Sequence, residues 1–179
     1  MSLTVEDGTG VAGADSYATQ AWIDGYWTAR PHLALSSTWT AATSDNKDGA
    51  AREATAYLDA AFGNFYRGKR RGYVQGLLWP RTDAKDEQGY PLPDLPDALL
   101  AAEAELAARA LSAPLAADID AGTRIRVQTK KVGPIEKSTE YFDAGQDAPK
   151  TSFGFVSDML APILNGTQPN APNPTWAWS

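Results

Sequence analysis

The sequence has no cysteine and a single histidine, His32, among its 179 residues. The absence of cysteine excludes disulfides and thiolate metal sites. The chain also lacks an apolar run long enough to cross a bilayer and a basic-then-apolar leader. We therefore expect no membrane contact, no signal peptide and synthesis in the cytosol. Hydrophobic residues nevertheless make up 43% of the chain, which is sufficient for one domain with a packed core.

Residues able to carry catalysis are also scarce. His32 stands in a loop, no serine lies in a G-x-S-x-G turn, and the Gly-Thr-Gly run at 8–10 is too short for a phosphate-binding loop. The segment 118–122 resembles the start of a calcium loop, but Thr129 stands where that loop requires a glutamate. We therefore expect no enzymatic activity, no cofactor and no bound metal.

The net charge of −6 disfavours nucleic acid as a general partner, although a local basic patch could still bind it. One dense basic cluster is present. It consists of Arg67, Lys69, Arg70 and Arg71. Tyr66 and Tyr73 flank the cluster, and basic residues beside aromatic ones are typical of single-stranded nucleic-acid binding. The alternative is a loop that faces an acidic partner or water, and the acidic balance of the rest of the chain favours this alternative.

Hydrophobic spacing predicts about four helices. We place them at residues 16–29, 50–62, 97–112 and 152–164, with a Ser/Thr-rich loop over 36–48. In the second helix, alanines recur at helical spacing with Leu58 and Phe62, which produces one apolar stripe. Before the third helix, we expect Trp79 and Pro80 to anchor the chain on the core. The prolines from 91 to 96 should set the angle at which that helix begins.

Alternating residues between 123 and 142 predict a β-hairpin that turns at Gly133 and Pro134. Its first strand is basic and its second acidic, so we expect complementary charges across the pair. A hairpin alone is marginally stable, which makes Val132, Gly133 and Pro134 candidate contacts with a neighbouring subunit. The fold class that follows is mostly α: a small bundle of about four helices with a β-hairpin and extended N- and C-terminal arms.

The two arms have different compositions. Residues 1–15 are polar and glycine-rich, and residues 166–179 form an uncharged, Pro/Asn-rich C-terminal tail. The tail carries Trp176 and Trp178. Tryptophan side chains are unfavourable in water, so we expect both to insert into a groove of this subunit or of a neighbour.

Glu103 lies within the apolar stripe of the third predicted helix. Three explanations are open. It is a buried acid with an arginine partner, or it marks a surface where a second subunit packs, or the helix has a slightly different phase. The second explanation makes Glu103 a candidate interface residue.

Several segments, in this order, resemble a known protein family. They are MSLTVEDGTGVAGADSYAT, ATAYLDAAFGNFYRGKRR, LLWPR, PDALLAAEAELAARAL, KVGPIEKS and SDMLAPIL. Together they cover residues 1–165, and LLWPR and KVGPIE are the most specific parts. The set is similar to the head–tail connector (adaptor) proteins of tailed bacteriophages, whose members are often labelled DnaT-like single-stranded-DNA-binding proteins.

The resemblance implies a structural virion protein whose residues 1–165 form an adaptor-like domain. Its subunits would form a ring, usually twelvefold, under the portal of a DNA-filled head. The ring would contact the portal protein and the stopper or tail proteins, and double-stranded DNA would pass through it without specific binding. The expected location is the neck of the virion. The alternative label implies an accessory protein that binds single-stranded DNA.

Overall fold

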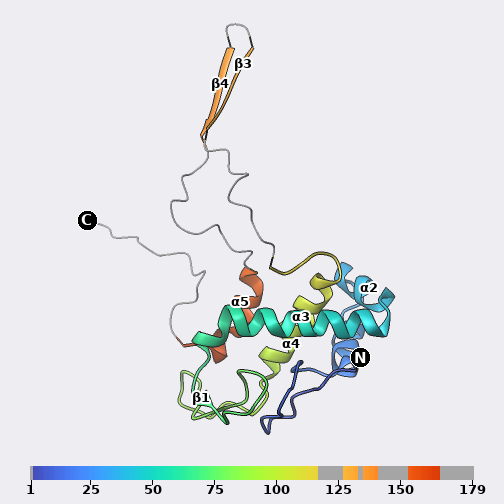
Figure 1. Cartoon of the computed structure of the whole chain (residues 1–179), viewed down its shortest axis with the longest axis vertical. Coiled ribbons are helices and arrows are strands. Elements are labelled where there is room, and N and C mark those ends of the chain that lie inside the picture. The colour runs from blue at the N-terminus through green and yellow to red at the C-terminus, as the bar shows by residue number, and fades with distance from the viewer. Residues whose placement is uncertain (1, 117–126, 133–134, 141–152, 166–179) are drawn as a thin grey trace, which may run out of the picture. The chain divides into compact units, whose positions relative to one another are not determined.

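The computed structural model describes residues 2–116, 127–132, 135–140 and 153–165, with side chains for 2–116 and 153–165 (Figure 1). The chain divides into two units, one of Met1–Leu115 with Phe153–Ser179 and one of Ala116–Ser152. The described part of the first unit is a helical bundle, and that of the second is a β-hairpin. The predicted fold class is therefore confirmed.

Five α-helices make up the described part of the bundle. They are α1 (Gln20–Thr28), α2 (Ala34–Ala41), α3 (Ser44–Phe62), α4 (Asp97–Ala110) and α5 (Gly154–Leu160). A 3₁₀ turn follows α3 at Gly63–Phe65, and another follows α5 at Ala161–Ile163. Figure 1 shows α3 and α4 crossing at the centre of the bundle, where α4 also packs on α1, α2 and α5.

α1 begins later than the pattern predicted. Thr19 is its N-cap, and the Thr19 hydroxyl accepts a hydrogen bond from the Trp22 amide at 3.1 Å. Ser16, three residues earlier, forms a β-bridge with Val5. The predicted start at residue 16 is therefore wrong, because this part of the chain pairs with the N-terminal arm instead.

α2 occupies part of the segment 36–48 that the sequence predicted as a loop, and that prediction is wrong. Serine and threonine disfavour helices because their side chains compete for backbone groups. In α2 the hydroxyl of Thr40 donates to the Ser36 carbonyl one turn earlier, at 2.8 Å. Burial of Trp39 in the core supplies the stabilisation that the local sequence lacks. α3 likewise begins at Ser44 and not at residue 50.

The alanine-rich α4 is enclosed by its own bundle. Its buried residues are Leu99, Ala102, Glu103, Ala104, Glu105, Leu106, Ala107 and Ala108. Small side chains let the neighbouring helices approach α4 closely. The close approach that alanine permits is therefore used inside the subunit, and these buried alanines are not available to a neighbouring subunit.

The N-terminal arm is extended and runs along the bundle. The amide of Glu6 donates to the Ser16 carbonyl at 2.9 Å. The carboxylate of Glu6 is buried and accepts hydrogen bonds from three backbone amides of the turn that follows, those of Gly8, Gly10 and Val11. A charged acceptor surrounded by amides holds the glycine-rich turn in one conformation.

Two small antiparallel sheets complete the described structure. In the first unit, β1 (Lys69–Arg70) pairs with β2 (Arg81–Thr82). The second unit contains β3 (Val127–Val132) and β4 (Ile135–Glu140), with Val127 opposite Glu140. The register corrects the expected charge pattern, because Lys131 lies opposite Glu136 but Lys130 lies opposite Lys137. Like charges at opposite positions destabilise a strand pair.

Four residues expected to contact a neighbour lie outside the described residues. They are Gly133, Pro134, Trp176 and Trp178. Val132 is the last residue of β3. Nothing in the structure tests whether these residues contact a neighbour, so that role stays a prediction.

Candidate nucleic-acid interface

A short two-stranded element, which we call the basic ribbon (residues 67–82), carries the basic cluster. It leaves the bundle after the 3₁₀ turn that follows α3. The guanidinium of Arg81 closes the ribbon by donating to the carbonyls of Arg67 at 2.7 Å and Gly68 at 2.8 Å. Gly68 has a φ of +74°, and a side chain there would collide with the Thr82 carbonyl, so this turn requires glycine.

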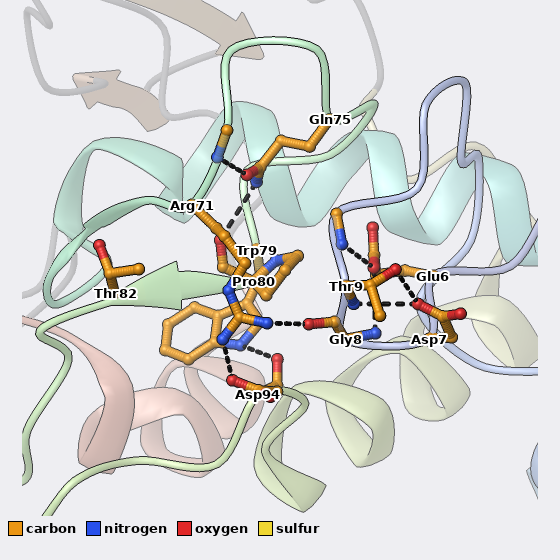
Figure 2. A network of polar contacts seen from close by, with 12 residues as sticks. Glu6, Asp7, Gly8, Thr9, Arg71, Gln75, Trp79, Pro80, Thr82 and Asp94 are labelled. Carbon is orange, nitrogen blue, oxygen red and sulfur yellow. Dashed lines mark hydrogen bonds and ion pairs between the residues drawn. The ribbon is translucent and has the colours of Figure 1, made fainter.

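Two of the four basic residues in the cluster serve the fold. The side chain of Arg67 is only 16% exposed, donates to the Lys85 carbonyl at 3.3 Å and pairs with Glu87 at 3.5 Å. Arg71 binds the Gly8 carbonyl of the N-terminal arm and the carboxylate of Asp94 (Figure 2). These contacts make Arg67 and Arg71 weaker candidates for a charged partner or DNA than the other two cations, and that role stays a prediction for all four.

The other two basic residues face solvent. Lys69 and Arg70 form β1, and both are exposed. Arg70 donates to the Gln75 carbonyl at 2.7 Å, and this acceptor carries no net charge. Within residues 2–116 and 153–165, no carboxylate forms an ion pair with either side chain. These two cations are therefore available to an anion.

Tyr73 projects from the loop that joins β1 to β2. Its side chain is 94% exposed, and the adjacent Val74 is 58% exposed. The other flanking tyrosine, Tyr66, is buried, with its ring edge-on to Trp79 at a centroid distance of 5.7 Å. The two tyrosines that the sequence placed together beside the cluster therefore have different roles, since only Tyr73 can meet a ligand.

The base of the basic ribbon is anchored on the bundle. Trp79 is fully buried, and its indole N–H donates to the Asp94 carbonyl at 2.6 Å (Figure 2). Asp59 of α3 accepts a hydrogen bond from the Leu78 amide at 2.9 Å and another from the Tyr17 hydroxyl. Burial raises the pKa of the Asp59 carboxyl. The predicted anchoring by Trp79 is confirmed, whereas no local pattern identified Asp59 as its support.

A second exposed tyrosine lies in the loop after β2. Tyr90 is 69% exposed, and its amide donates to the Asp86 carboxylate at 2.8 Å. Its neighbours along this loop include Asp83, Asp86 and Glu87. A negatively charged surrounding disfavours the approach of a phosphate, so Tyr90 is a poorer candidate for nucleic-acid contact than Tyr73.

The net negative charge of the chain overstates the negative charge of its surface. Among the residues whose side chains the structure describes, four acidic ones are buried, namely Glu6, Asp48, Glu103 and Glu105. Glu105 is neutralised by its ion pair with Arg109 at 2.6 Å, and burial raises the pKa of Glu103 to about 7, so these two acids add less negative charge than their number implies. The acidic composition therefore does not argue against an anion at the basic ribbon as strongly as the sequence suggested.

Glu103 is enclosed within the subunit and cannot form part of an interface. It is fully buried and hydrogen-bonded to the Ser16 hydroxyl at 2.6 Å and the Ala18 amide at 2.7 Å. No arginine forms an ion pair with it among the described side chains. The explanation that Glu103 is a buried acid with an arginine partner was right about the burial and wrong about the partner. The N-terminal segment supplies the polar groups that an arginine would have supplied.

A shallow groove between α1 and the start of α4 is a competing site. Trp22 and Tyr26 stack there with ring centroids 5.8 Å apart, and the floor includes Gly25 and Ala101. The guanidinium of Arg30 lies 3.6 Å from the centre of the Tyr26 ring. Because this cation is already paired with an aromatic face, the groove is less suited to a phosphate than the basic ribbon is.

Two other kinds of site are absent from the part of the chain that the structure describes. No group of three His, Asp or Glu side chains there could hold a metal ion. None of the described helices is long and apolar enough to span a bilayer.

The fold and this surface define a small helical protein with an exposed basic and aromatic ribbon. Residues 1–173 match the family described as "Putative DnaT-like ssDNA binding protein". The chain belongs to this family. No curated protein and no solved structure matches the chain.

The family match corrects the function expected from the resemblance. The matching family is one of DnaT-like single-stranded-DNA-binding proteins and not one of head–tail connectors. The assignment to a connector, its ring, and its portal, stopper and tail partners are therefore wrong, as is the expected passage of double-stranded DNA. The location at a virion neck is not tested.

Proposed function

We propose that this protein binds single-stranded DNA through the surface formed by Lys69, Arg70 and Tyr73 of the basic ribbon. The observation that carries the proposal is the position of an almost fully exposed tyrosine three residues after two exposed, unpaired cations, on an element anchored in the core. Positive charge beside an aromatic ring is the combination that binds a single strand with little sequence preference. Membership of the family supports the same function.

Each of the three residues has a distinct role in this proposal. Lys69 and Arg70 neutralise phosphates, and the release of condensed counterions from the strand makes that contact favourable. Tyr73 stacks on a base, and it requires an unpaired base because a duplex hides the faces of its bases within the helix. The proposal is one of binding without catalysis, since ion pairing and stacking require no reactive group.

Fluorescence anisotropy with a labelled single strand and the matching duplex tests the proposal. We expect the single strand to bind more tightly than the duplex. We expect Tyr73→Ala to weaken binding by about 1–3 kcal/mol, the usual contribution of one stacked base. Tyr90→Ala is the matched control, because it removes an exposed tyrosine from acidic surroundings and should have little effect.

The charge contribution is tested in the same assay. Lys69→Gln should weaken binding, while Lys85→Gln removes the same charge from the loop after β2 and should change the affinity less. Equal losses in the two variants would mean that only the overall charge matters. Full affinity in both Tyr73→Ala and Lys69→Gln would exclude the basic ribbon as the binding surface.

A further inference from the structure

Gln75 is a buried polar residue at the end of the loop that presents Tyr73. Its side chain is 4% exposed and makes three hydrogen bonds. The Oε1 atom accepts from the Gly72 amide at 2.7 Å. The Nε2 group donates to the Leu77 carbonyl at 2.8 Å and to the Pro80 carbonyl at 3.2 Å. One amide side chain therefore joins the beginning of the loop to the segment that follows it.

We infer that Gln75 is a positioning residue that holds Tyr73 outward and ready to stack on a base. This inference rests on the proposed function. The loop reverses within a few residues, and Gln75 closes it by serving as acceptor on one side and donor on the other. The two residues between Gly72 and Gln75 are then directed into solvent, which accounts for the exposure of Tyr73 and Val74.

The backbone around Gln75 prevents the loop from moving as a whole. The next residue, Gly76, donates its amide to the Val11 carbonyl of the N-terminal arm at 3.0 Å. A side chain at Gly76 would meet the backbone of Ala14 at 2.6 Å, so the arm and the loop lie in direct contact. The backbone that carries Tyr73 is thereby fixed before DNA arrives, and a preorganised loop loses less conformational entropy on binding than a mobile one.

The chemistry of the contact requires an amide. Leucine has a similar size but would leave the Gly72 amide and two carbonyls without this partner. Glutamate would retain the acceptor but would place a second oxygen against the carbonyls of Leu77 and Pro80. Only a side chain with a donor and an acceptor on the same planar group satisfies all three contacts.

A double-mutant cycle separates positioning from general stability. The variants are Tyr73→Ala, Gln75→Leu and the double variant, and the measurement is the affinity for a labelled single strand. We expect Gln75→Leu to weaken binding when Tyr73 is present, by up to the factor lost in Tyr73→Ala, which is between about fivefold and 150-fold. In the Tyr73→Ala background, the same change should have no further effect.

The slope of affinity against salt concentration provides a second readout. It should be unchanged in Gln75→Leu, because every cation is retained. Equal losses from Gln75→Leu with and without Tyr73 would overturn the inference while leaving the proposed function intact. If Tyr73→Ala itself has no effect while the protein still binds DNA, the proposed site fails first and the inference fails with it.

A measurement on the unaltered protein keeps the inference testable if Gln75→Leu does not fold. Hydrogen exchange followed by NMR should show the Gly72 amide protected and the Tyr73 amide exchanging rapidly, both before and after DNA is added. Rapid exchange at Gly72 in the free protein would show that Gln75 does not hold the loop, and would overturn the inference. Gly72→Ala is a control for a substitution in the loop that keeps the backbone amide bound by Gln75, because a side chain at residue 72 meets no atom within 4 Å.

Discussion

At the scale of single residues, Glu103 is explained best as a neutral carboxylic acid. The Ser16 hydroxyl lies 2.6 Å from the Glu103 carboxyl and 2.7 Å from the Ala18 carbonyl, yet it carries one hydrogen. A protonated Glu103 makes both contacts full hydrogen bonds, because Glu103 then donates to Ser16 and Ser16 donates to Ala18. Burial acts in the same direction, because it raises the pKa of Glu103 from 4.5 to about 7.

A raised pKa in the folded state makes stability depend on pH in a definite direction. Below pH 4.5 the folded and unfolded states both hold the proton, and the buried acid is not penalised. Between 4.5 and about 7 the unfolded state releases its proton while the folded state retains it. We therefore expect the free energy of unfolding to fall across this range by roughly 3 kcal/mol, and urea unfolding at several pH values measures it.

Glu103→Gln is the matched control for that prediction. The glutamine amide can donate to Ser16 and accept from the Ala18 amide, as the neutral acid does, and it has no proton to lose. We expect the variant to be less sensitive to pH than the natural protein and more stable at pH 8. The same pH dependence in both proteins would show that another group, such as the half-buried Asp59, is responsible.

At the scale of secondary-structure elements, α2 forms because of its environment and against its own sequence. Its Trp39 is buried, donates from the indole nitrogen to Asp24 at 2.7 Å and lies under the ammonium of Lys47 at 5.3 Å. We expect Trp39→Ala to lower the free energy of unfolding by about 3–5 kcal/mol because it leaves a large cavity. Denaturant unfolding measures the loss. Thr40→Ala, on the exposed face of the same helix, should change stability little.

The N-terminal arm is a second element whose conformation depends on a few polar contacts. The Glu6 carboxylate is the shared acceptor of three amides in the glycine-rich turn. We expect Glu6→Gln to cost about 1–3 kcal/mol, because a neutral amide accepts fewer and weaker bonds and brings a donor into the site. Hydrogen exchange at Gly8, Gly10 and Val11 should accelerate in the variant. Unchanged exchange there would show that contacts elsewhere hold the turn.

At the scale of the whole molecule, the distribution of charge over the surface matters more for DNA binding than the net charge does. If Lys69 and Arg70 are the cations that contact phosphates, the logarithm of the binding constant should fall with the logarithm of salt concentration with a slope of about −1.4. Titrations at several salt concentrations measure this slope. A markedly steeper slope would mean that further cations take part, and Lys130, Lys131 and Lys137 of the β-hairpin unit are then the first to replace with glutamine.

The sequence predicted the features of this structure that depend on residues close together in the chain, and it missed those that depend on distant contacts. The amphipathic α3 and the alanine-rich α4 were recognised because their apolar residues repeat at helical spacing, which is a property of neighbouring residues. The segment of α2 was taken for a loop because its hydroxyl residues have a local preference that burial of Trp39 overrides. The basic cluster was found by composition, and composition alone could not divide it into structural and available cations.

By itself, the sequence determined the fold class, the absence of thiol chemistry and the location of the basic cluster, because periodicity and composition depend on residues close together in the chain. Only the tertiary structure decided that Arg67 and Arg71 are engaged with distant groups, that Tyr66 is core and Tyr73 is exposed, and that Glu103 is sealed by the N-terminal segment. Each of these outcomes depends on partners many positions away. Such partners meet only when the chain folds, and no local pattern records them.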